Sequence, residues 1–131
     1  MTPLPPSGIG DAAVVWLSVP RPSGPPHTTP VWFVLVDGRI WIASSTVNRK
    51  VQLLQDHPSV SLAVDGSGSE PSVAEGTATI HHDLDRFPSI LAALAEKHPG
   101  WDPADPEQDG PRVLVEVAVT RWLMGGPTTQ R

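Results

Sequence analysis

Short apolar segments separated by proline- and glycine-rich stretches run along the chain and predict a mainly β protein. In six of them, β-branched and aromatic residues alternate with polar ones or form a short continuous run, as in strands. The six are 12–19, 27–36, 39–44, 59–64, 73–80 and 112–119. Asp37 and Gly38 join the second and third as a two-residue hairpin turn.

The hairpin formed by the second and third segments is apolar on both faces. Successive side chains of a strand point to opposite sides, so one face carries Val31, Phe33 and Leu35 and the other carries Trp32, Val34 and Val36. We therefore expect burial on two sides, as in a closed barrel whose outer surface is covered by a helix or a partner subunit. Pro30 predicts an edge, a bulge or a gap in pairing, and Gly76 a bulge or the close approach of another backbone or a ligand.

Two segments have the spacing of helices. Residues 48–56 predict a short helix with Asn48 as N-cap and Pro58 marking its end. Residues 83–98 predict a longer one, kinked or restarted at Pro88, with apolar residues at helical spacing: Leu84, Phe87, Leu91 and Leu94. Six strands with these two helices predict a small six-stranded antiparallel β-barrel.

Composition narrows the class of protein. The 131 residues predict a single domain over 1–131, with 1–11 as a flexible proline-rich arm. The absence of cysteine excludes disulfides and thiolate chemistry and fits a reducing cytoplasm. A net charge of −5 argues against nucleic-acid binding. No apolar run approaches the roughly 18 to 20 residues of a membrane span, and the N-terminus lacks the features of a signal peptide. We expect a soluble, cytoplasmic protein.

Arg49 and Lys50 fall in the first turn of the predicted short helix, where the helix dipole disfavours cations. Their placement is understandable if an anion binds there, because free N–H groups at a helix start and two cations form a phosphate site. Solvated surface charges are the alternative. Short polar side chains precede the pair: Ser44, Ser45, Thr46 and Asn48.

A second candidate lies in the strand 27–36. A gap in pairing at Pro30, next to Thr28 and Thr29, leaves backbone groups available to a planar, hydrogen-bonding ligand. An ordinary edge-strand proline is the alternative. Trp32 and Trp41 either wall an aromatic site or fill the core.

No residue stands out as a general acid or base. His81 and His82 suggest a metal site, but adjacent strand residues point to opposite faces, so we predict none. Glu75 and Glu116 fall within strands, either as a buried acid pair or on exposed or intersubunit faces. Catalytic residues stay unassigned, which points to chemistry carried by a bound cofactor.

The order of four stretches resembles a known superfamily. PHTTPVWFV, DGRIWIASS, NRKVQLLQDHPSVSLAV and VAEGTA are similar to the pyridoxamine-phosphate-oxidase-like, FMN-binding split β-barrel proteins. Within these, the chain most resembles the actinobacterial flavin/deazaflavin oxidoreductases. The resemblance spans about 13–123 and is most specific in RK-x-x-x-L-x-x-x-P at 49–58 and EG-x-A at 75–78.

The resemblance implies a homodimer with two cofactor sites at the subunit interface. It places Ser44, Arg49 and Lys50 on the cofactor phosphate and Trp122, with Arg121, at the site from the C-terminal segment. The second strand then lines the ring of the cofactor with Thr28, Thr29, Pro30, Val31 and Trp32.

The implied activity is transfer of a hydride from coenzyme F-420, a deazaflavin, to a small organic acceptor, with FMN as the alternative cofactor. A non-catalytic carrier of flavin, haem (with His27 or His57 as ligand) or a lipid-like molecule is a second hypothesis, and a structural dimer with a degenerate site is a third. The chain departs from the family in its proline-rich N-terminus and in Asn48, which replaces a glycine or serine. The C-terminal pattern of true pyridoxamine-phosphate oxidases is absent, so that activity is not inferred.

Overall fold

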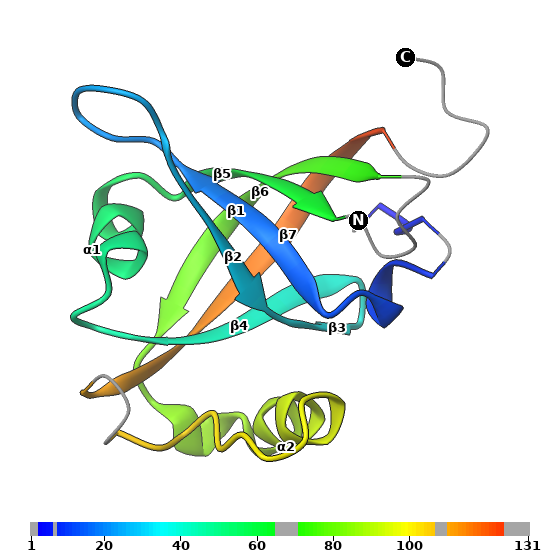
Figure 1. The fold of residues 1–131 in the computed structure, drawn as a ribbon, viewed down its shortest axis with the longest axis vertical. Helices are drawn as coiled ribbons and strands as arrows, with labels where there is room; N and C mark the ends of the chain where they lie inside the picture. Colours follow the sequence, from blue (N-terminus) through cyan, green and yellow to red (C-terminus); the bar gives the residue numbers. More distant parts are fainter. Residues whose placement is uncertain (1–2, 7, 65–70, 107–109, 125–131) are drawn as a thin grey trace.

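One antiparallel sheet of seven strands makes up most of the molecule (Figure 1). The computed structural model describes residues 3–6, 8–64, 71–106 and 110–124. The strands are β1 Val14–Val19, β2 His27–Trp32, β3 Val34–Val36, β4 Arg39–Ser45, β5 Ser59–Val64, β6 Ser72–His81 and β7 Arg112–Met124. Their order in the sheet is β2-β1-β5-β6-β7-β4-β3.

The two edge strands of this sheet, β2 and β3, are consecutive in the chain and separated only by Phe33. The sheet must therefore curl until its edges meet, which produces the half-open barrel visible in Figure 1. The mainly β, split-barrel prediction is confirmed, but the strand number is seven rather than six. The predicted strand 27–36 is two strands because the chain changes partner at Phe33: β2 pairs with β1 and β3 pairs with β4.

The curled sheet encloses the main core. Val31 and Leu35 pack against this core and Phe33 lies fully inside it. On the opposite side of the hairpin, Val34 and Val36 pack against a second apolar cluster beneath the longer helix. The expected two-sided burial is thus confirmed along the hairpin except at Trp32, which is 45% exposed. The hairpin turn has positive φ at both Asp37 (54°) and Gly38 (78°), as its sequence predicts.

The helices follow their predicted signals closely. Helix α1 is Arg49–Asp56, and the Asn48 side chain caps its N-terminus. The predicted helix 83–98 is divided into a 3-10 helix, η2 Leu84–Arg86, and α2 Pro88–Lys97. Pro88 occupies the first turn of α2, where its missing N–H costs nothing, so the helix restarts there. No helix in the described ranges is long and apolar enough to cross a membrane.

Strands β6 and β7 approach each other closely at Gly76. The pairing register shifts between Glu75 and Gly76, and a Cβ added at Gly76 would lie 2.8 Å from the Ala118 carbonyl oxygen. Both predicted features, a bulge and a close backbone approach, are present. Strand β7 continues past the predicted residue 119 because its partner β6 extends far enough to pair with it.

The 3-10 helix η1, Ile9–Asp11, lies within the predicted arm, and its Ile9 is buried.

Candidate functional site

The seam where the curled sheet fails to close contains a pocket of about 190 Å³. Strand β2 is an edge strand, and β3 pairs with β4 only from Arg39 to Trp41. The rest of β4 pairs with β7 on one edge, and its other edge, toward β2, has no paired strand. The pocket is lined by Val31, Trp32, Ala43, Ser44, Asn48, Lys50, Trp101 and Arg112. Strands β2 and β4, the start of α1, the loop after α2 and the start of β7 all contribute to it.

Asn48 holds a cation at one end of this pocket. Its Oδ1 accepts a hydrogen bond from the Lys50 backbone N–H at 3.2 Å and from the Lys50 Nζ at 2.9 Å. The Lys50 side chain is consequently buried, with 7% of its surface exposed, at the N-terminus of α1. Arg49 is exposed and does not line the pocket. The structure thus separates the basic pair into one pocket residue and one surface residue.

Arg112 is a second buried cation of the pocket, and it is not among the site residues predicted from the sequence. It is 8% exposed, and its Nε donates a hydrogen bond to the Pro103 carbonyl oxygen at 3.0 Å. Arg112 pairs with Ser45 across β4 and β7, which brings it to the seam. A signal was available in the sequence: a charged residue begins a strand that is otherwise mainly apolar.

Three aromatic rings adjoin the pocket. The rings of Trp32 and His98 are stacked, with centroids 4.8 Å apart and planes at 8°, and Trp101 lies edge-on to Trp32 at 5.0 Å and 73°. The His98 Nε2 donates a hydrogen bond to the Phe33 carbonyl oxygen at 3.1 Å. His98 and Trp101 were missed because they lie more than sixty residues from Trp32, in a loop region without a recognisable motif.

Three cationic side chains act on His27, at the start of β2, although the whole chain carries a net charge of −5. Partial burial lowers the pKa of His27, and the positive charges of Arg21, Lys50 and Arg49 lower it further. Arg21 also lies 3.3 Å from the imidazole, measured from its Nη2 to the Nδ1 of His27. The positive charges disfavour a protonated histidine and favour an anion, whereas desolvation, the larger cause, disfavours a charge of either sign.

The other residues predicted from the sequence do not line the pocket. Thr28 is exposed and shares a hydrogen bond with Ser18 on β1, at 2.9 Å. Trp122 lies ten residues beyond Arg112 on β7, roughly 30 Å away along an extended strand. The residues outside the pocket are Thr28, Thr29, Pro30, Ser45, Thr46, Arg49 and Trp122.

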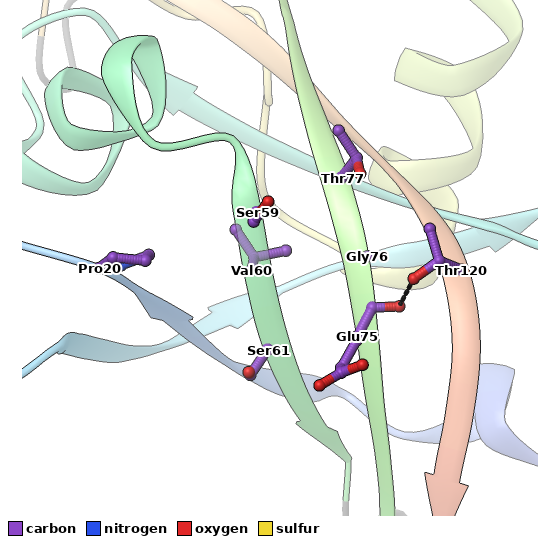
Figure 2. Close-up of a pocket in the computed structure, with 8 residues that line it drawn as sticks. All are labelled: Pro20, Ser59, Val60, Ser61, Glu75, Gly76, Thr77 and Thr120. Atoms are coloured by element: carbon purple, nitrogen blue, oxygen red, sulfur yellow. Dashed lines mark hydrogen bonds between the residues drawn. The ribbon is translucent and has the colours of Figure 1, made fainter.

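A larger hollow, of about 420 Å³, lies on the outer side of β5, β6 and β7. Figure 2 shows Ser61 and Glu75 entering it from neighbouring strands, with Thr120 hydrogen-bonded to the Glu75 carbonyl oxygen at 3.1 Å. Arg121 pairs with the Glu75 carboxylate at 2.9 Å. The lining of this larger hollow is hydroxyl-rich, with neither a cation nor an aromatic ring. The seam pocket, although smaller, is therefore better suited to a phosphate-bearing ring.

Glu75 and Glu116 do not form an acid pair. Glu116 accepts hydrogen bonds from His81, at 2.8 Å, and from Arg39, whereas Glu75 pairs with Arg121. Among the residues that the structure describes, no group of three or more histidine or acidic side chains could hold a metal ion.

A curled antiparallel sheet whose edges meet without closing defines a split β-barrel. Residues 8–124 match the pyridoxamine 5'-phosphate oxidase family model, which shows that the chain belongs to this family. No curated protein matches the chain.

Solved structures share this fold. A conserved hypothetical protein from Mycobacterium tuberculosis is 24% identical, with 87% of this chain and 77% of that chain covered and a TM-score of 0.72. An F420 reductase is 19% identical, with 92% and 97% covered and a TM-score of 0.73. The haem storage protein HutZ from Vibrio cholerae is 15% identical, with 88% and 89% covered and a TM-score of 0.70. At these identities, the similarity establishes a common fold.

Proposed function

We propose that the seam pocket binds a planar redox cofactor through its phosphate, and that the protein is an oxidoreductase acting on a small organic acceptor in the cytoplasm. Coenzyme F-420 is the proposed cofactor and FMN the alternative. One observation carries the proposal: two buried cations, Lys50 and Arg112, line the same pocket as a half-exposed tryptophan, Trp32. When bound, such a cofactor supplies or accepts a hydride, chemistry that protein side chains do not provide.

The cationic end of the pocket is suited to the phosphate. Lys50 and Ser44 line the same pocket at the start of α1, and together they offer a charge-assisted and a neutral donor to an anion. Asn48 holds the ammonium in place before any ligand arrives, which reduces the ordering cost of binding. Arg49 then contributes long-range attraction from the surface rather than a contact.

The aromatic end is suited to the ring. Trp32 and Trp101 line the pocket next to the apolar side chains of Val31 and Ala43. These groups offer stacking area and exclude water from a flat heteroaromatic ring. The chain's contribution to the reaction is therefore to bind, orient and desolvate, with no dedicated acid or base assigned.

A second copy of the chain would complete the site. The pocket measures about 190 Å³, below the roughly 300–1,000 Å³ of typical cofactor sites. Next to the pocket lies a surface that we term the outer face, which is the solvent side of β2, β1, β5, β6 and β7. It carries two adjacent rows of residues. One row is polar (Thr28, Ser18, Ser61, Glu75 and Arg121) and the other is apolar (Pro30, Trp16, Ala63 and Val73).

This outer face has the properties of a homodimer interface. Trp16 is 48% exposed beside Pro30, and the hollow of Figure 2 lies on the same face. Glu75 and Arg121 are complementary charges within one row, so that two copies related by a twofold axis can exchange their ion pairs. Trp32 belongs both to this face and to the pocket, so a second copy seated here would border the cofactor.

The proposal is tested by titrating the purified protein with F-420, FMN and riboflavin and following cofactor fluorescence. We expect the two phosphate-bearing molecules to bind more tightly than riboflavin. Lys50→Ala should weaken FMN binding by about tenfold or more, because a charge-assisted contact is lost, and leave riboflavin binding nearly unchanged. Arg49→Ala is the matched control with a smaller effect. Absence of affinity for all three molecules would overturn the proposal.

A non-catalytic carrier is the second candidate function. It is supported by the lining of the pocket, which contains no carboxylate, histidine or hydroxyl other than Ser44, and by the shared fold of the haem storage protein. Incubation of the loaded, reduced protein with a panel of alkene, imine and quinone acceptors separates the two. Oxidation of the cofactor faster than in free solution identifies an enzyme, and an unchanged rate identifies a carrier.

A further inference from the structure

At the wall of the seam pocket, His98 contacts the side chain of Trp32 and the backbone of Phe33. Its imidazole lies parallel to the Trp32 indole, with centroids 4.8 Å apart and planes at 8°. The same imidazole donates a hydrogen bond from Nε2 to the carbonyl oxygen of Phe33, the next residue in the chain. Because a carbonyl oxygen only accepts, this contact places a proton on Nε2 and fixes the plane of the ring.

The hydrogen bond falls where the sheet cannot supply one. Phe33 lies between β2 and β3, outside the pairing of either strand, and its side chain is fully buried. A buried carbonyl without a partner is costly, and His98 satisfies it. The imidazole is itself 7% exposed, so water does not compete for the contact.

The end of α2 fixes the position of the imidazole in turn. His98 is the C-cap of α2, and its backbone N–H donates to the Leu94 carbonyl oxygen at 3.0 Å. The His98 carbonyl oxygen accepts from the Trp101 N–H at 3.3 Å, and the Trp101 ring lies edge-on to both His98 and Trp32. One short turn therefore places two of the three rings, those of His98 and Trp101, against the third.

We propose that His98 is a positioning residue that holds Trp32 as a rigid wall for a flat heteroaromatic ring, an inference that rests on the proposed cofactor function of the pocket. Trp32 is on an edge strand and 45% exposed, a setting in which an indole ordinarily samples several rotamers. His98 covers one face of the indole, Trp101 lies edge-on to it, and Trp32 still lines the pocket. Fixing the wall before binding removes an ordering cost that the ligand otherwise bears.

Two variants separate the stacking from the hydrogen bond. His98→Gln keeps an N–H donor for the Phe33 carbonyl and removes the aromatic ring, whereas His98→Phe keeps a ring and removes the donor. His82→Gln, at an exposed histidine, is the matched control. FMN, riboflavin and inorganic phosphate are the probes, and circular dichroism near 230 nm reports the coupling of Trp32 with Trp101 without any ligand.

With His98→Gln we expect FMN and riboflavin to bind about three- to tenfold more weakly, in proportion to the loss of one aromatic pair. Inorganic phosphate should bind as it does to the wild type, and the circular dichroism couplet should diminish. His98→Phe should retain the couplet and the affinity for both ring probes, with a lower melting temperature. A purely structural role would instead weaken all three probes together.

The inference is overturned if His98→Gln binds both ring probes as tightly as the wild type and keeps its couplet. That result would leave the proposed cofactor function intact. If the wild type binds neither FMN, F-420 nor riboflavin, the proposed function fails and this inference fails with it. The two failures are distinguished by the wild-type titration alone.

Discussion

Gly76 lies where the backbone of β7 comes so near β6 that no side chain fits. A Cβ at this position would be 2.8 Å from both the Ala118 carbonyl oxygen and Val117 Cγ1. We expect Gly76→Ala to lower the free energy of unfolding by about 1–3 kcal/mol, because part of the clash is with backbone that cannot rotate away. Urea denaturation measures the change. In the control Gly10→Ala, the new methyl meets Leu35 at 3.6 Å and should have little effect. Equal stability of the two variants would contradict the prediction.

Glu116, on β7, bridges His81 on β6 and Arg39 on β4. Desolvation alone would raise the pKa of its carboxyl, but hydrogen bonds from His81 and Arg39, together with their charges, lower it below the ordinary 4.5. A carboxyl whose pKa is lower in the folded state stabilises the fold above the unfolded-state pKa. That contribution is lost as the pH falls through the folded-state pKa.

The resulting prediction concerns stability below about pH 4.5. Glu116→Gln should lower the free energy of unfolding at neutral pH by about 1 kcal/mol and lose less stability than the wild type on acidification. Urea denaturation at a series of pH values from neutral to about pH 3 measures both effects. Glu96→Gln, on the exposed face of α2, should follow the wild-type profile. Parallel profiles for Glu116→Gln and the wild type would refute the assignment.

At the scale of elements, the start of α1 combines stability and binding in one side chain. Asn48 caps the helix and holds the Lys50 ammonium. We expect Asn48→Asp to keep the cap, since aspartate is an equally good N-cap, and to change stability little. The added negative charge beside Lys50 should weaken FMN binding about tenfold or more. Asn48→Ser, a neutral cap, is the control, and FMN titration with urea denaturation gives both quantities. Wild-type FMN affinity in Asn48→Asp would place the phosphate elsewhere.

The elements were predictable wherever their signals are local. Strand β5 has its predicted bounds, the Asp37–Gly38 turn has the positive φ values its residues favour, and Pro88 begins α2. The break at Phe33 was not predictable, because Phe33 lies within the continuous apolar run 31–36 and only the choice of partner strands divides it. The length of β7 was not predictable either, because it depends on how far the paired strand β6 extends.

At the scale of the whole molecule, the outer face is the feature to test. Trp16 stands at the centre of its apolar row, so Trp16→Lys should keep the fold, yield a monomer and weaken the binding of F-420 or FMN. Analytical ultracentrifugation with cofactor titration checks both effects. Leu4→Lys, which removes a 91% exposed leucine elsewhere, is the control and should stay dimeric. A monomeric wild type would refute the interface.

The sequence alone was sufficient for the kind of secondary structure, the class of fold, the helix cap and the basic pair after it, because each depends on neighbours within a few residues. It also placed Val31, Trp32, Ser44, Asn48 and Lys50 among the site candidates, and these are the ones that line the seam pocket. Only the tertiary structure added Arg112, Trp101 and His98 and left Arg49 and Trp122 outside that pocket. The physical reason is the curling of the sheet. Which edges meet, and which distant side chains they bring together, depends on pairings between strands far apart in the chain that no local pattern encodes.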